Sequence, residues 1–165
     1  MNMEQWTDNF GVQFEKDENG VVSLVKAPEN IKEYAIPDYV TEIGECAFGQ
    51  CYALTKISIP NSVTKIGDYA FFECFGLTSV SIPESVVEIG TCAFGYCFEL
   101  ASISISMSNM KLGEGVFVGC LKLTHITIPE PRPQTANTKV HIIKKRRYYI
   151  EYSEADPNSP DRKSV

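Results

Sequence analysis

Histidine, long apolar runs and basic surface are all scarce in this 165-residue sequence. The two histidines, His125 and His141, have no recurring serine or carboxylate beside them that would make a base and nucleophile pair. No apolar run approaches the roughly 18–20 residues that cross a bilayer, and the net charge of −6 argues against a general nucleic-acid binder. We therefore expect no enzymatic activity, no cofactor, no metal, no membrane insertion and no nucleic-acid partner.

The charge of the chain changes along its length. Residues 1–35 carry three Lys or Arg and seven Asp or Glu, residues 36–128 carry four and nine, and residues 129–165 carry eight and five. This change from acidic to basic composition places a boundary near Pro129. The start, MNMEQWTDNF, has neither the basic nor the apolar region of a signal peptide. The sequence therefore leaves two cellular locations possible: the protein stays inside the cell, or the chain is a trimmed piece of an exported protein.

A repeat of 23 residues runs through the middle of the chain. Ile36-Pro37, Ile59-Pro60 and Ile82-Pro83 are one period apart, and Ile128-Pro129 lies two periods further on. Four consecutive coils in one register predict a repeat architecture. The same spacing links four glycines, four phenylalanines, four cysteines and four leucines: Gly44, Gly67, Gly90, Gly113; Phe48, Phe71, Phe94, Phe117; Cys51, Cys74, Cys97, Cys120; Leu54, Leu77, Leu100, Leu123.

Each coil reads as two short extended segments and a turn. In LTSVSIP the alternation places Val80 and Ile82 on one face, which is typical of a strand, and Pro83 ends it. SVVEIG is a second extended segment, and we expect Gly90 to turn the chain there at positive φ. TCAFGYC has the spacing of one helical turn. One coil alone cannot bury enough apolar surface to fold, so the coils must stack into a solenoid.

The frame of the second coil, IPNSVTKIGDYAFFECFGLTSVSIP, closely resembles the BspA-type leucine-rich repeat, and the resemblance covers Ile36 to about Glu130. The resemblance implies a β-rich solenoid of about four coils, with short parallel strands on a concave side and helical or 3-10 turns. It also implies bacterial proteins, at the cell surface or secreted, that bind other macromolecules without catalysis. The fourth coil departs from the frame, because Ser106 and Asn109 replace the proline and the inward valine.

Three parts of the chain follow from this pattern. Residues 1–35 form an N-terminal segment with a capping hairpin at about 12–25, because alternating runs flank the turn signal DENG. Residues 36–130 form the solenoid. Residues 131–165 form a linker, a strand or hairpin at 139–152, and a polar tail that we expect to be disordered.

The four in-register cysteines favour core packing, because a free cysteine behaves as a small buried hydrophobe. Disulfides between neighbouring coils fit poorly with stacked strands about 4.8 Å apart. Zinc fits less well, since pairs such as Cys46 and Cys51 are five residues apart. Cys46 and Cys92 lie off this column, and we expect them to be the more exposed thiols.

A row of small polar residues occupies the outward strand positions. One interpretation is purely structural, because such residues let tight coils stack. The other is a hydrogen-bonding platform on the concave face for a protein or glycan ligand. The candidate binding residues are Lys56, Ser58, Ser79, Ser81, Ser102, Ser104, His125 and Thr127.

The basic cluster KKRR, Lys144–Arg147, is a second feature with two interpretations. It is a site for an acidic partner, an anionic lipid or a localisation receptor, or it is a solvated connection that protects a strand edge.

For the whole chain, the sequence favours a non-enzymatic macromolecule-binding module for protein binding or adhesion. The alternative is a purely structural spacer with no ligand of its own. The oligomeric state is not determined by these patterns.

Overall fold

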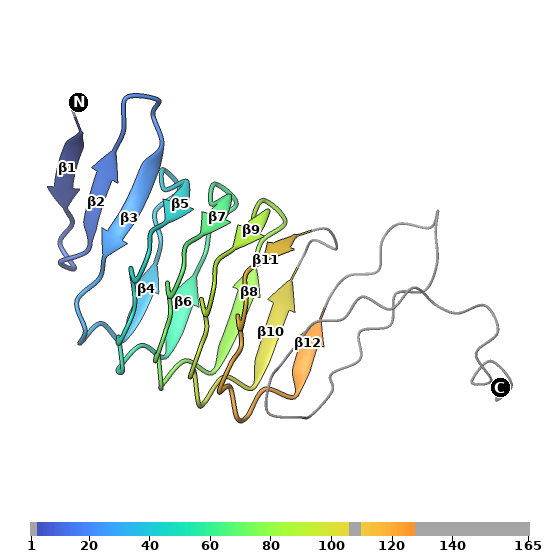
Figure 1. Cartoon of the computed structure of the whole chain (residues 1–165). Coiled ribbons are helices and arrows are strands. Elements are labelled where there is room, and N and C mark those ends of the chain that lie inside the picture. Colours follow the sequence, from blue (N-terminus) through green and yellow to red (C-terminus); the bar gives the residue numbers. More distant parts are fainter. Residues whose placement is uncertain (1–2, 106–109, 128–165) are drawn as a thin grey trace, which may run out of the picture.

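The chain winds into a solenoid whose coils place short strands on two sides, as Figure 1 shows. The computed structural model describes residues 3–105 and 110–127. Its strands are β1 (Glu4–Thr7), β2 (Gln13–Lys16), β3 (Val22–Lys26), β4 (Glu33–Ala35), β5 (Glu42–Ile43), β6 (Lys56–Ser58), β7 (Lys65–Ile66), β8 (Ser79–Ile82), β9 (Glu88–Ile89), β10 (Ser102–Ile105), β11 (Lys111–Leu112) and β12 (His125–Thr127).

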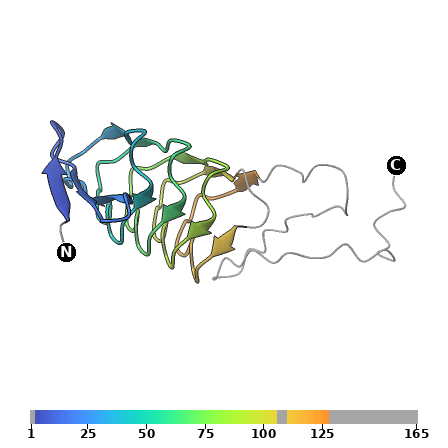
Figure 2. The same cartoon turned by 90° about the horizontal axis from the view of Figure 1, so that it is seen from above.

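The predicted register is confirmed by the strand pairing. On one side, β5, β7, β9 and β11 are parallel neighbours, and Ile66 pairs with Ile89 one coil further on. On the other side, β8, β10 and β12 are parallel, and Ile103 lies between Val80 and Ile126. The view along a perpendicular direction in Figure 2 shows these coils stacked one behind another.

The residues that fill the coils are those the 23-residue spacing predicts. Val63, Ile66, Phe71, Leu77, Val80 and Ile82 are all buried, whereas Lys65, Asp68 and Ser81 are exposed. A slip of one residue would exchange these two groups, so the observed burial fixes the register. The core therefore consists of matched columns of Phe, Leu, Ile, Val, Ala and Cys side chains.

The helical turn predicted for TCAFGYC is wrong, because the described residues contain no helix. The N–H groups of Cys92, Phe94 and Tyr96 donate instead to carbonyls of the next coil, at 2.6 to 2.9 Å. Two of these three donors have left-handed backbone, with φ of 49° at Cys92 and 57° at Tyr96. The turn is therefore a third row of hydrogen bonds between coils, which a helix with internal bonds would not provide.

The expected positive φ at Gly90 is also wrong, since the left-handed glycines of the described residues are Gly11, Gly20, Gly115 and Gly119. Gly90 is required by close approach: a Cβ there would lie 2.5 Å from the backbone nitrogen of Asp68 in the preceding coil. The columns of glycine therefore let consecutive backbones touch, which no larger residue allows.

The N-terminal end of the solenoid is closed by antiparallel strands. β2 and β3 pair as a hairpin around DENG, where the Asp17 carboxylate accepts hydrogen bonds from the N–H groups of Asn19 and Val21. β3 then pairs in parallel with β5, so the hairpin joins the seven-stranded sheet. β1, which the sequence did not suggest, pairs with β2 and places Trp6 on the ring of Phe14 at 5.5 Å.

Several predictions fall on residues outside the described parts of the chain. They include the first turn of the fourth coil at Ser106–Asn109, the linker and strands expected within 131–165, and the basic cluster Lys144–Arg147. The division of the chain into three parts remains a prediction.

Candidate functional site

The candidate binding residues lie on β6, β8, β10 and β12, and we call their surface the hydroxyl face. Its residues are Lys56, Ser58, Ser79, Ser81, Ser102, Ser104, His125 and Thr127. Parallel pairing places Ser79 opposite Ser102 and Ser81 opposite Ser104. It places His125 opposite Ser102 and Thr127 opposite Ser104 in the next strand. The pairing thus arranges the positions on β8, β10 and β12 in two rows.

Exposure varies along the hydroxyl face between β6 and β10, and one sheet does not carry all of the face. Ser79 and Ser81 are exposed, and Ser102 and Ser104 are half-buried. β6, with Lys56 and Ser58, pairs with β4, whereas β8 pairs with β10. The rows therefore pass from a two-stranded to a three-stranded sheet between β6 and β8.

The cysteine column is part of the core. Cys51, Cys74, Cys97 and Cys120 are fully buried free cysteines. The Cys74 thiol donates to the carbonyl of Phe48 at 3.2 Å. One and two coils later, the thiols of Cys97 and Cys120 make the same contact with Phe71 and Phe94, at 3.1 and 3.0 Å. Each thiol thus uses a spare lone pair of a carbonyl in the preceding coil, so the column ties coils together.

Burial makes these thiols poor nucleophiles. It raises the pKa of Cys51 to about 11. Hydrogen bonding with Cys97, followed by burial, raises the pKa of Cys120. Off the column, Cys46 is exposed and Cys92 half-buried. Burial and then the carboxylates of Asp68 and Glu114 raise the pKa of Cys92, so a smaller fraction of this thiol is deprotonated and reactive.

No metal-binding cluster of three or more His, Cys, Asp or Glu side chains occurs within residues 3–105 and 110–127. In the same part of the chain, no helix is long and apolar enough to cross a membrane.

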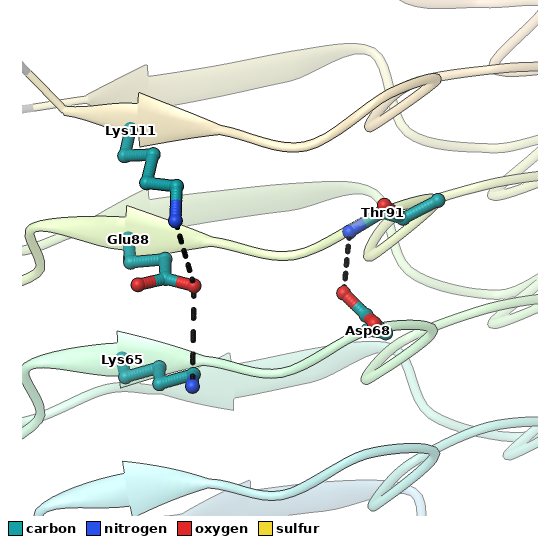
Figure 3. Close-up of polar contacts among 5 residues, drawn as sticks. All are labelled: Lys65, Asp68, Glu88, Thr91 and Lys111. Atoms are coloured by element: carbon teal, nitrogen blue, oxygen red, sulfur yellow. Dashed lines mark hydrogen bonds and ion pairs between the residues drawn. The ribbon is translucent and has the colours of Figure 1, made fainter.

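The sheet opposite the hydroxyl face carries alternating charges, shown in Figure 3. The carboxylate of Glu88 lies 3.9 Å from the amino group of Lys65 and 3.8 Å from that of Lys111, on the neighbouring strands β7 and β11. Beside them, the Asp68 carboxylate accepts a hydrogen bond of 2.7 Å from the N–H of Thr91. Exposed ion pairs add little to the free energy of folding. Because the sign of the charge alternates from strand to strand here, however, the pairs favour one register between neighbouring coils.

A surface that the sequence analysis missed lies along the turns of the first three coils. We call it the aromatic ridge, and it consists of Tyr52, Tyr69, Phe72, Phe75, Tyr96 and Phe98. Tyr52, Phe75 and Phe98 stack in one column with ring centroids 4.9 Å apart. The signal was present in the sequence, because these three residues are also 23 apart.

The turn segments that carry the aromatic ridge are acidic. Segments 44–54, 67–77, 90–100 and 113–123 contain five carboxylates and one lysine, Lys122, which is paired with Glu99. The carboxylates are Glu45, Asp68, Glu73, Glu99 and Glu114.

Comparison with protein families gives one match across most of the repeats. A model described as "BspA type Leucine rich repeat region (6 copies)" matches residues 26–139. No curated protein matches the chain.

Comparison with solved structures gives bacterial proteins of the same fold. A leucine-rich repeat protein from Bacteroides capillosus is 24% identical, with a TM-score of 0.68, and the match covers 76% of this chain and 99% of that one. A "leucine rich cell surface protein" from Faecalibacterium prausnitzii is 28% identical, with a TM-score of 0.57, covering 78% of this chain. The match spans 40% of the length of the Faecalibacterium protein.

Proposed function

Since the chain belongs to the BspA-type leucine-rich repeat family, whose repeats are modules generally used for binding, we propose that it is a non-enzymatic binding module. Its contact surface is the hydroxyl face, and its partner is a protein or glycan. By analogy with the Faecalibacterium protein described as a cell surface protein, it acts at a bacterial cell surface or after secretion.

The observation that carries this proposal is the register of β8, β10 and β12. Ser81, Ser104 and Thr127 occupy equivalent positions in neighbouring parallel strands. Such strands are about 4.8 Å apart, so an extended polymer meets several hydroxyl groups in succession. Lys56 and His125 occupy the two ends of the face and add groups that can carry charge.

The affinity of a single chain should be modest. A neutral hydrogen bond contributes only about 0.5–1.5 kcal/mol net, and ordering the partner offsets part of this. Useful affinity then depends on several chains binding together.

The test is a double substitution, Ser81→Arg with Ser104→Arg, in the full chain. The wild type and the variant are incubated with arrays of purified glycans and extracellular proteins, and ligands of the wild type are titrated. We expect the two cations to abolish binding. Because Ser81 is exposed but Ser104 is half-buried, the free energy of unfolding should fall by about 1 kcal/mol or less, and the variant stays folded.

The matched control is Thr64→Arg with Val87→Arg. These two exposed residues are also 23 apart, but they lie beside the opposite sheet. Binding that survives the change at Ser81 and Ser104, or that is lost equally in the control, contradicts the proposal. A wild type that binds nothing on either array favours the structural spacer.

A further inference from the structure

We propose that the aromatic ridge is the docking surface for the chain's own basic segment, residues 139–152, within the same molecule. The ridge and the hydroxyl face are different surfaces, so this inference does not depend on the proposed function. It gives a role to Lys144–Arg147, which that function leaves without one.

The first argument is the exposed apolar surface of the ridge. Tyr52, Tyr69 and Tyr96 are 45%, 36% and 41% exposed, and Leu121 continues the column of Tyr52 at 75% exposed. Phe72, Phe75 and Phe98 between them are half-buried. Contiguous apolar patches of this kind are uncommon on soluble proteins without a partner.

The ring geometry restricts what can bind. Stacking closes most faces in the column of Tyr52, Phe75 and Phe98, where the interplanar angles are 26° and 12°. Few ring faces are then open to stack on the flat face of a sugar, whereas ring edges suit apolar and aromatic side chains. A peptide segment therefore fits the ridge better than a glycan.

The charge around the ridge selects a cationic segment. Glu73 lies between Phe72 and Phe75 in the sequence and accepts a hydrogen bond from the neutral Gln50 amide, so its charge is not balanced by that contact. Glu99 follows Phe98 and is paired with Lys122, an exposed pair that a second cation can share. Asp68 precedes Tyr69, and it is exposed. Carboxylates beside the rings favour Lys and Arg through ion pairs and charge-assisted hydrogen bonds.

Residues 139–152, KVHIIKKRRYYIEY, have the complementary chemistry. They contain the only run of four cations in the chain, and isoleucines and tyrosines flank this run. The linker before this segment is also long enough for the segment to reach the aromatic ridge. The eleven residues 128–138 extend to at most roughly 36–40 Å, whereas the distance from the fourth coil to the first is about 15 Å at 4.8 Å per coil.

The experiment is limited trypsin digestion of the full chain, followed by intact mass spectrometry. Lys144–Arg147 offer four cleavage sites within the proposed docked segment. Arg162 and Lys163 lie beyond it and provide an internal reference. We expect the first group to be cut at least about tenfold more slowly than a synthetic peptide of residues 139–152, because cleavage requires undocking. Raising NaCl from about 0.05 M to about 0.5 M should reduce this protection.

The decisive variant is Glu73→Gln with Glu99→Gln, which should bring cleavage at Lys144–Arg147 close to the rate of the free peptide. The matched control, Glu33→Gln with Glu84→Gln, removes two exposed carboxylates that lie outside the ridge. It should leave the protection unchanged. Absence of cleavage at Lys65 and Lys111, within β7 and β11, shows that the solenoid of each variant is folded.

Three results would overturn the proposal. In the first, Lys144–Arg147 are cut as fast as the peptide in the wild type. In the second, protection persists in the Glu73 and Glu99 variant, which places the segment elsewhere. In the third, protection appears only as protein concentration rises, which makes a second copy the source of the docked segment.

Discussion

The second and third coils and the fourth coil share one sequence frame, but they are packed differently. The ring of Phe71 stacks on those of Phe48 and Phe94, both at 5.0 Å and nearly parallel, at 6° and 4°. Phe94 and Phe117 are 6.0 Å apart and inclined by 23°. The aromatic column is therefore looser at the fourth coil.

The backbone contact between coils does not loosen in the same way. A Cβ at Gly113 would lie 2.4 Å from the nitrogen of Thr91, much as one at Gly90 would lie 2.5 Å from that of Asp68. The thiol of Cys120 is as close to its carbonyl as that of Cys97. Contact with the preceding coil is thus kept to the end of the described solenoid, while side-chain packing also depends on a following coil.

The largest effect we expect is from Phe71→Ala, and Phe117→Ala sharpens the comparison. Truncating Phe71 should lower the free energy of unfolding by about 3–5 kcal/mol, because it leaves a cavity in the core. Phe117 stacks on one described ring instead of two, so Phe117→Ala should cost about 0.5–1.5 kcal/mol less. Urea unfolding followed by circular dichroism measures both, and equal losses contradict the difference between the coils.

Gly90→Ala and Gly113→Ala should have equal effects, each about 1–3 kcal/mol. In both cases the new Cβ meets the backbone of the preceding coil, which cannot move without separating the strands. The control is Gly76→Ala, whose Cβ would lie no closer than 3.1 Å to its neighbours. If Gly113→Ala is well tolerated in the same unfolding assay, the backbone contact of the fourth coil is as loose as its aromatic packing.

The buried thiols should make stability fall as pH rises. The folded-state pKa of Cys51 is about 11, above its ordinary value of 9.0, so the protonated thiol is favoured in the folded protein. Its contribution is complete below pH 9 and is lost between pH 9 and 11, at about 1.4 kcal/mol per pH unit.

The same measurement compares the coils. The pKa of Cys120 is also raised, so Cys51→Ala and Cys120→Ala should each reduce the slope of unfolding free energy against pH by a similar amount. A slope that Cys120→Ala leaves unchanged would show that the thiol of the fourth coil is already accessible to solvent.

The smallest effect is at the left-handed turn positions. Gln50 has a φ of 63°, while the equivalent residue of the fourth coil is Gly119. Gln50→Gly should stabilise the protein by about 0.5 kcal/mol, because relief of strain slightly exceeds the greater freedom of glycine in the unfolded chain. Gly119→Ala should destabilise it, since its Cβ would lie 2.5 Å from the ring of Tyr96. Differential scanning calorimetry of both variants measures these changes.

Periodicity made the register of the core predictable, because the positions of Val80 and Ile82 are also inward positions in the other coils. It did not reveal why Gly90 is glycine, since a backbone approaching from another coil leaves no local pattern. The same holds for the helical turn expected at Ala93, Phe94 and Cys97: its spacing suits a helix, but hydrogen bonds to the next coil replace it.

For the candidate site, the sequence predicted which strand positions face outward but not how they are joined. Ser79, Ser102 and His125 are in register as expected. The change from one sheet to another between β6 and β8 depends on strand pairing, which no residue type in these strands predicts. The aromatic ridge was missed for a different reason. Tyr52, Phe75 and Phe98 have core-like spacing, and their exposure follows only from the path of the turns.

The hydrogen bonds between coils also determine how the protein would respond to mechanical force. They run along the axis of the solenoid on three sides, as in the bonds from Phe48 to Ala70, Thr64 to Thr41 and Ala101 to Thr78. A pull on the two ends along this axis loads few bonds at a time, so coils would peel away singly instead of shearing together. Each coil released would lengthen the chain by roughly 70 Å, the extended length of 23 residues less one coil spacing. A tether built in this way extends in equal steps, and the length of the repeat sets the size of each step.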